Sequence, residues 1–178
     1  TSTLTFTGDS NQIVHPNFFS WSKVKTYFHQ SGDIHRQIQI LQTNYRNSLR
    51  VVQLSNDLLK IKNTRFGSID RESHYLVHTI SEHRGEVILY QDDERKKTEL
   101  NRRTQNSTQY AVIVSDNSDK ESVRKYFKTP LLFSIQEAKG LEYENVILFN
   151  FISRHESEFK EIIDGVKPED LQQTELKY

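Results

Sequence analysis

Cysteine, long apolar runs and an excess of charge of either sign are all missing from this sequence. Without cysteine, its 178 residues form no disulfide and offer no thiol nucleophile. No stretch is long and apolar enough to predict a membrane span or a signal peptide. The 24 Lys and Arg residues balance 24 Asp and Glu residues, so binding of nucleic acid needs a local patch. We expect an intracellular, cytoplasmic protein without a membrane partner.

Methionine is missing as well, and the chain begins at Thr1. These two features lead us to expect a part of a longer protein. The length is sufficient for one substantial core, or for one domain together with part of another.

Short apolar runs alternate with segments of helical periodicity along the chain. Strands are predicted at 3–7, 36–41, 86–90, 110–115, 130–133 and 146–149. Helices are predicted within 15–28, from Asn47 or Ser48 to about Lys62, over 92–105, after a Ser118–Glu121 capping box and over 156–163. Val123, Tyr126 and Phe127 should face the core from the helix after this box. A long loop with a short helix is expected over 63–84. This alternation predicts an α/β fold with a mainly parallel sheet.

The most informative segment is 134–142, Ser-Ile-Gln-Glu-Ala-Lys-Gly-Leu-Glu, which lies between the last two predicted strands. It is typical of a strand followed by a functional loop or short helix and a second strand. Loops at the ends of buried strands carry much of the ligand chemistry of α/β proteins. A simpler alternative is a turn between strands with a capping glutamate.

This segment resembles motif V of the UvrD/Rep-like superfamily 1 helicases, whose pattern is roughly Thr-x-His-Ser-Ala-Lys-Gly-Leu-Glu. Residues 138–142 match the pattern, and Ser134 is a conservative replacement of its threonine. Gln136 stands where histidine is usual. The match is a hypothesis that its structural context must support.

Two earlier segments resemble further motifs of the same family, in the family's order. Gly-Asp-Ser-Asn-Gln at 8–12 resembles motif III, and its alternative is a plain turn. Leu-Gln-Thr-Asn-Tyr-Arg-Asn-Ser at 41–48 resembles motif IV at a junction between strand and helix. Its alternative is a solvated arginine near a helix start.

The resemblance implies a nucleotide site made of five residues. Gln12 would sense the terminal phosphate of ATP, and Arg46 would reach the γ-phosphate, so both are candidate catalytic residues. Tyr45 would stack on the base, and Glu142 would hydrogen-bond the ribose. Gly140 would let the backbone approach the ligand.

The resemblance also implies a nucleic-acid site in the motif V loop. Ser134, Gln136 and Lys139 would contact the backbone of single-stranded DNA, and RNA is a possible substrate too. The charge of Lys139 could equally pair with Glu137 or Glu144.

The fold implied by the resemblance is a RecA-like three-layer domain of the P-loop NTPase superfamily. Residues 1–32 would be the end of a first RecA-like domain, and 33–178 would form the second, without a large insertion. The sequence contains neither a phosphate-binding Gly-x-x-x-x-Gly-Lys loop nor an acidic pair for Mg²⁺ in the expected place. ATP and Mg²⁺ are therefore expected in the complete protein, and no cofactor is expected to bind this fragment tightly.

The resemblance predicts the C-terminal motor part of an ATP-dependent DNA helicase, whose partners are single-stranded DNA and an N-terminal RecA-like domain. This part alone should not hydrolyse ATP. The alternatives are a non-catalytic RecA-like module that binds nucleic acid or protein, and a fragment of an RNA helicase. No metal site is predicted, because His74, His78 and His83 lack a fourth ligand.

Overall fold

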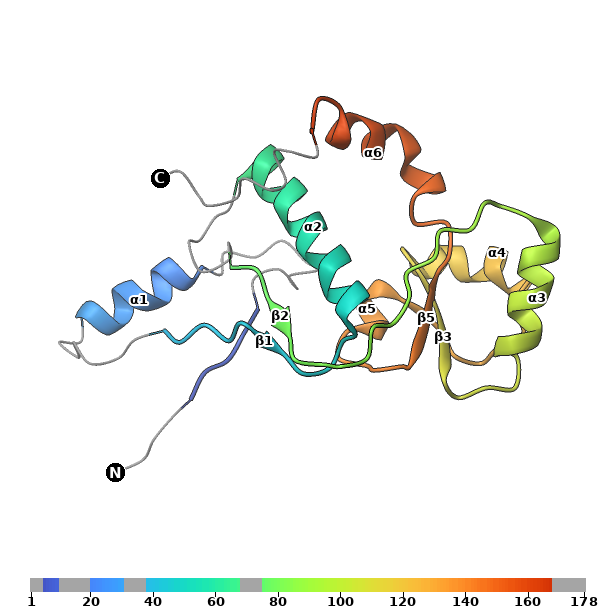
Figure 1. The fold of residues 1–178 in the computed structure, drawn as a ribbon, viewed down its shortest axis with the longest axis horizontal. Coiled ribbons are helices and arrows are strands. Elements are labelled where there is room, and N and C mark those ends of the chain that lie inside the picture. The colour runs from blue at the N-terminus through green and yellow to red at the C-terminus, as the bar shows by residue number, and fades with distance from the viewer. Residues whose placement is uncertain (1–4, 10–19, 31–37, 68–74, 168–178) are drawn as a thin grey trace. The chain divides into compact units, whose positions relative to one another are not determined.

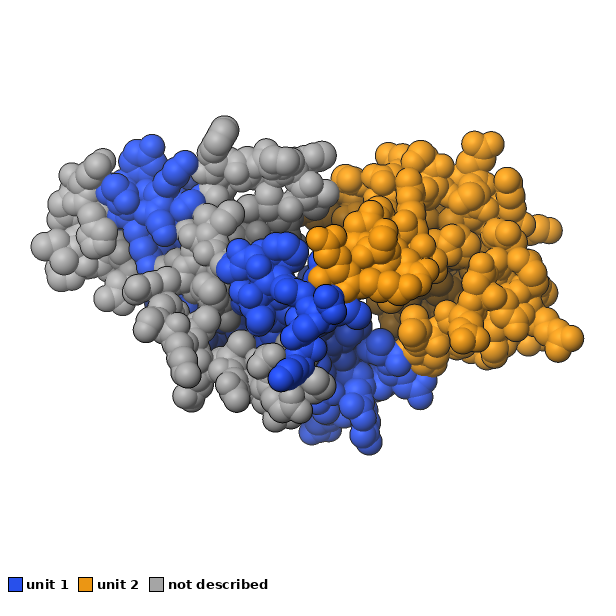
Figure 2. All heavy atoms as spheres, turned by 90° about the horizontal axis from the view of Figure 1, so that it is seen from above, with its two compact units in different colours: residues 1–87, 162–178 blue, residues 88–161 orange. Residues whose placement is uncertain are grey.

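The computed structural model describes residues 5–9, 20–30, 38–67 and 75–167 (Figure 1). The chain divides into two compact units, which Figure 2 shows in different colours. Unit 1 comprises Thr1–Val87 and Ile162–Tyr178, and unit 2 comprises Ile88–Glu161.

Unit 2 is built on a parallel sheet of three strands. The strands are β3 (Tyr110–Val114), β4 (Leu132–Ser134) and β5 (Asn145–Leu148), in the order β4-β3-β5. Val112 in the central strand is aligned with Leu132 of β4 and Ile147 of β5. The α/β class and the parallel pairing are therefore confirmed. The RecA-like three-layer architecture stays a prediction.

The core of unit 2 lies beside β3. Its buried side chains are Val112, Val114, Val123, Phe127 and Leu132. The partly buried Leu100, Tyr126, Ile147 and Phe149 pack against them. The rings of Phe127 and Phe149 meet edge to face, with centroids 5.8 Å apart, a favourable geometry for aromatic pairs. The predicted inward orientation of Val123, Tyr126 and Phe127 is confirmed.

Helix α3 (Glu94–Thr104) matches the predicted polar helix at 92–105. The carboxylate of Asp93 caps it by accepting from the backbone N–H of Arg95 at 2.7 Å. The Lys97 ammonium lies 4.1 Å from the ring centroid of Tyr126, whose face attracts a cation. Hydrogen bonds from Lys97 to Asp92 and Glu94 raise the pKa of this lysine. A single lysine thus helps to dock an otherwise polar helix.

The helical segment after β3 begins two residues earlier than predicted. A 3-10 helix, η3 (Asn117–Asp119), precedes α4 (Lys120–Arg124). The capping box joins Asp116 and Asp119, so the prediction of a box at Ser118 and Glu121 is wrong. Asp119 reaches the backbone N–H of Asp116 at 3.3 Å, and this contact places the cap before Ser118.

The remaining helices of the later chain are short. They are α5 (Ile135–Ala138), the 3-10 helix η4 (Ser153–His155) and α6 (Glu156–Ile163). Helix α6 has the predicted bounds. Among the described residues, no helix is long and apolar enough to cross a membrane.

Unit 1 contains α1 (Trp21–Gln30), β1 (Thr43–Asn44), α2 (Leu49–Phe66) and β2 (His78–Thr79). Strands β1 and β2 are parallel. The side chain of Asn56 in α2 donates to the carbonyl of Val77 at 2.7 Å and accepts from its N–H at 3.2 Å. The predicted helices within 15–28 and from 47–48 are confirmed in their described parts, although α2 continues to Phe66.

Three predicted strands are not seen in the part of the chain that the structure describes. Residues 5–7, 38–41 and 86–90 do not form strands. Near the strand predicted at 36–41, the described chain forms β1 at Thr43–Asn44 instead. Leu41 and Leu89 are each 83% exposed. An alternating pattern favours an extended chain, but a strand also needs a neighbour to complete its hydrogen bonds. The loop expected over 63–84 contains the end of α2 and strand β2, and residues 68–74 lie outside the described ranges.

Candidate functional site

The candidate site residues fall into two groups, one in each unit. Tyr45 and Arg46 lie together in unit 1, and the loop 134–142 lies in unit 2. Gln12 lies outside the described residues.

The motif IV segment of unit 1 forms a turn between β1 and α2. The side-chain oxygen of Asn44 accepts from the backbone N–H groups of Arg46 at 3.0 Å and Asn47 at 2.7 Å. This Asx-type turn holds the backbone on both sides of Tyr45 and Arg46. Both side chains are exposed, Tyr45 for 76% of its surface. The turn therefore presents an aromatic ring and a guanidinium side by side in sequence to solvent.

The start of α2 is hydrogen-bonded to the backbone of residues 83–84. Its N–H groups at Leu49 and Arg50 donate to the carbonyls of His83 at 3.2 Å and Arg84 at 3.0 Å. Gly85 follows with φ +62°, and a Cβ there would overlap the Oγ of Ser48. These first N–H groups already have partners, so they do not form an open anion site.

The motif V segment of unit 2 begins with a capping box. Ser134 ends β4, is fully buried, and accepts from the N–H of Glu137 at 3.4 Å. The Glu137 carboxylate accepts from the N–H of Ser134 at 2.8 Å and from its hydroxyl at 3.3 Å. The simple alternative foreseen from the sequence, a glutamate in a capping role, is thus present at Glu137. Contact of Ser134 with nucleic acid stays a prediction.

Lys120 adds a charge to this cap. Its ammonium, at the start of α4, pairs with the carboxylate of Glu137 in α5. The Lys120 hydrogen bond, followed by the backbone hydrogen bond from Ser134, lowers the pKa of Glu137. The partner of Glu137 is therefore Lys120, a residue that the sequence did not single out. Pairing with Lys139 was one of the alternatives left open by the sequence.

The rest of the loop turns at Gly140. Its φ of +84° suits glycine, and a Cβ there would meet nothing within 4 Å. The N–H of Leu141 closes the turn by donating to Ala138 at 2.9 Å. The candidate ligand contacts Gln136, Lys139 and Glu142 are exposed around it. The loop therefore offers an amide, an ammonium and a carboxylate beside open backbone.

The return from this loop to the sheet is anchored by aromatic stacking. The ring of Tyr143 lies 5.7 Å from that of Phe133, with 29° between their planes. Because Phe133 belongs to β4, this contact holds both ends of the loop at the same strand.

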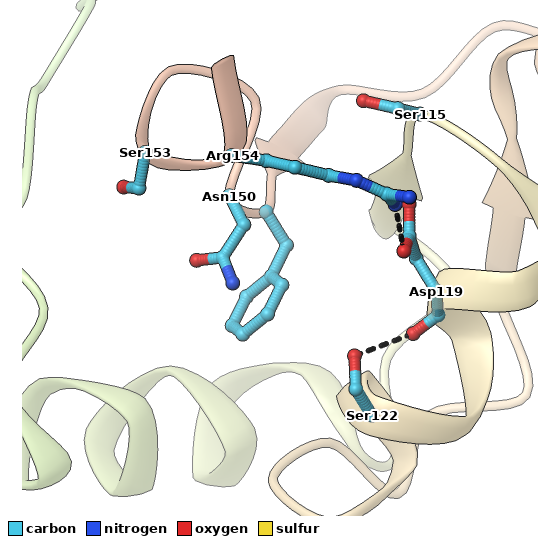
Figure 3. Close-up of a pocket in the computed structure, with 7 residues that line it drawn as sticks. Ser115, Asp119, Ser122, Asn150, Ser153 and Arg154 are labelled. Carbon is cyan, nitrogen blue, oxygen red and sulfur yellow. Dashed lines mark hydrogen bonds and ion pairs between the residues drawn. The ribbon is translucent and has the colours of Figure 1, made fainter. Parts of the chain in front are cut away.

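A small pocket of about 220 Å³ lies at the carboxyl ends of β3 and β5 (Figure 3). It is lined by Ser115, Asp119, Ser122, Phe149, Asn150, Ser153 and Arg154. Arg154 reaches across to form an ion pair with Asp119. Ser122 Oγ donates to the carbonyl of Asp119 at 2.7 Å. Sequence reasoning missed these residues; the only available signal was their position just after buried strands.

The part of the chain that the structure describes contains no group of three or more His, Asp or Glu residues able to hold a metal ion. Comparison of the chain with models of protein families, with curated proteins and with solved structures found no match in any of the three.

Proposed function

We propose that the chain is the C-terminal motor part of a UvrD/Rep-like superfamily 1 DNA helicase, which couples ATP hydrolysis to translocation on single-stranded DNA. The observation that carries the proposal is the Ala-Lys-Gly-Leu-Glu segment between two parallel strands, with a glycine of positive φ at its turn. A segment that follows the carboxyl end of a parallel strand, as this one follows β4, favours ligand binding.

Each unit, taken by itself, exposes groups of the kind that bind a nucleotide. The ring of Tyr45 offers a stacking surface for a base, and the guanidinium of Arg46 suits a phosphate. The carboxylate of Glu142 suits a pair of ribose hydroxyls, and the open backbone at Gly140 allows close approach. By the resemblance, Gln12 would contact the terminal phosphate. In the complete protein ATP would be the phosphoryl donor and Mg²⁺ would neutralise charge on its phosphates, whereas this chain would contribute contacts to the nucleotide.

Two exposed side chains suit the backbone of a single strand. The amide of Gln136 can donate to a phosphate oxygen, and the ammonium of Lys139 adds charge. Ser134 contributes by capping α5, because its hydroxyl is buried against Glu137. In this proposal Ser134 positions the loop that contacts the strand.

Binding of a fluorescein-labelled oligodeoxythymidine, measured by fluorescence anisotropy over a range of salt concentrations, tests the proposal. Lys139→Ala should weaken binding about 5-fold and reduce the salt slope by about 0.7, because one phosphate contact is lost. Lys128→Ala is the matched control, since Lys128 is an exposed lysine of unit 2 outside the loop. It should bind as the unchanged chain does.

Failure of the unchanged chain to bind the oligonucleotide, or equal losses in both variants, would contradict the proposal. An oligouridine of the same length decides between DNA and RNA as the preferred strand. Phosphate release from ATP should stay at the background level for this chain, and robust hydrolysis would contradict its assignment as one part of a motor.

A further inference from the structure

Two consecutive residues of opposite charge connect the three strands of unit 2 beyond their carboxyl ends. Asp119 and Lys120 follow β3, the central strand. Asp119 pairs with Arg154, which follows β5, and Lys120 pairs with Glu137, which follows β4. The segments after both outer strands are thus held by one dipeptide.

Glu137, the partner of Lys120, lies within the candidate loop 134–142. Glu137 stands where the motif V pattern has serine, so the loop carries an additional carboxylate. Such a carboxylate would repel the phosphates of a bound strand unless it is neutralised. The Lys120 ammonium touches it, and the two side chains are 20% and 43% exposed. Lys120 therefore supplies the opposite charge that this departure from the pattern requires.

The backbone of Lys120 is itself well held. Asp119 accepts from the N–H of Asp116, and its own N–H donates to the carbonyl of Asp116 at 3.0 Å. Arg154 binds the same carboxylate, which is 23% exposed. Lys120 begins α4 directly after these contacts, so its side chain starts from a fixed point.

We propose that Lys120 is a positioning residue for the loop 134–142: it holds Glu137 in the cap of α5 and cancels its charge, so that the loop accepts a phosphate of single-stranded nucleic acid. This inference rests on the function proposed above. It assigns Lys120 an effect through Glu137, in contrast to a direct contact between Lys120 and the strand.

A double-mutant cycle in the full chain separates these two roles. Lys120→Met should weaken binding of the labelled oligodeoxythymidine about 5-fold, because Glu137 then faces the phosphates uncompensated. Glu137→Gln, which keeps an acceptor for the cap, should bind at least as tightly as the unchanged chain. The double variant should return to within about 2-fold of the unchanged chain, since neither charge remains. Lys128→Met is the control for the loss of an exposed lysine and should have no effect.

A second measurement is independent of nucleic acid. In a carboxyl NMR titration, Lys120→Met should raise the pKa of Glu137 toward the ordinary value of roughly 4.3. Lys120→Arg should keep it low, because a guanidinium restores the ion pair. Because the pKa of Glu137 is lowered in the folded chain, its charged form stabilises the folded loop at pH values above the ordinary glutamate pKa. This stabilisation is lost as the pH falls through the lowered pKa.

The outcomes distinguish the two proposals. If the double variant binds as weakly as Lys120→Met, Lys120 acts by direct contact and the positioning role is overturned, while the proposed function stands. An unchanged pKa of Glu137 in Lys120→Met overturns the positioning role as well. If the unchanged chain binds neither oligodeoxythymidine nor oligouridine, the proposed function fails and the phosphate part of this inference fails with it.

Discussion

Four glycines in the described ranges have positive φ angles, but their surroundings differ. A Cβ at Gly67 or Gly140 would enter open space, so at these positions only the backbone conformation favours glycine. At Gly85 a Cβ would overlap both side-chain atoms of Ser48. The Gly85 position therefore combines a conformational requirement with a close approach of two chain segments at the start of α2.

A pair of alanine substitutions separates these two effects. Gly67→Ala should lower the free energy of unfolding by about 1–3 kcal/mol, the cost of a backbone conformation (φ 67°, ψ -164°) that is essentially confined to glycine. Gly85→Ala should cost about 1–3 kcal/mol more, because the overlap with Ser48 must be relieved by a backbone shift. Urea unfolding followed by circular dichroism measures both.

Substitution of Ser48, which lies next to Gly85 in the structure, provides the control for Gly85. Ser48→Gly in the Gly85→Ala chain removes the overlapping atoms and should recover most of the additional loss. Equal losses for Gly67→Ala and Gly85→Ala would show that crowding at Ser48 has no energetic weight.

Helix caps set where the short helices of unit 2 begin. Asp93 caps α3, Asp116 and Asp119 cap η3, and Ser134 and Glu137 cap α5. Each capping side chain satisfies a backbone N–H that has no partner within its helix. The Glu137 carboxylate that caps α5 also forms the ion pair with Lys120. The same carboxylate therefore belongs to the helix cap and to the candidate site.

Helix α3 provides the clearest test at this scale. Asp93→Ala should lower the free energy of unfolding of unit 2 by about 1 kcal/mol, because the 2.7 Å hydrogen bond to Arg95 is lost. Asp93→Ser should retain most of the stability, since a serine hydroxyl also caps helices. Thermal unfolding of the three chains gives the comparison. A loss as large for serine as for alanine would mean that the charge of Asp93, and not the cap, is what stabilises α3.

The two units differ greatly in how much apolar surface they bury. Among the described residues, the hydrophobic core lies in unit 2, and Val52 is the single buried apolar side chain of unit 1. Helix α2 exposes several large apolar side chains, namely Leu49, Leu54, Leu58 and Phe66. Burial of apolar surface is the main favourable term in folding, so the two units should differ in stability.

Hydrogen exchange followed by mass spectrometry on the full chain measures this difference. Amides of α2 should exchange at least about 100-fold faster than those of β3, because local opening of α2 exposes little additional apolar surface. The strand β3 is flanked on both sides by hydrogen-bonded neighbours and serves as the internal reference. Equal protection of α2 and β3 would show that the units unfold together.

Much of the secondary structure was predictable, because it depends on local patterns. The stripe of Val51, Leu54, Leu58 and Ile61 predicted α2, and the apolar run at 110–115 predicted β3. The run at 86–90 has the same character, yet it forms no strand in the structure. An extended segment becomes a strand only beside a partner, and the sequence of the segment does not name one. The cap of η3 was predicted at the wrong residue, because Asp116 and Ser118 are both suitable capping residues within one turn. The sequence alone does not say which of them begins the helix.

The sequence by itself determined the α/β class, the parallel character of the sheet and the candidate residues of the loop 134–142. Periodicity and short motifs carry this information, because neighbouring residues along the chain share one element. Only the tertiary structure decided that Lys120, and not Lys139, pairs with Glu137, and that Asp119 reaches Arg154. These contacts follow from the strand order β4-β3-β5 and the parallel pairing, because the three segments that follow these strands then start at the same end of the sheet. That order is set by packing among distant segments, and no local pattern encodes it.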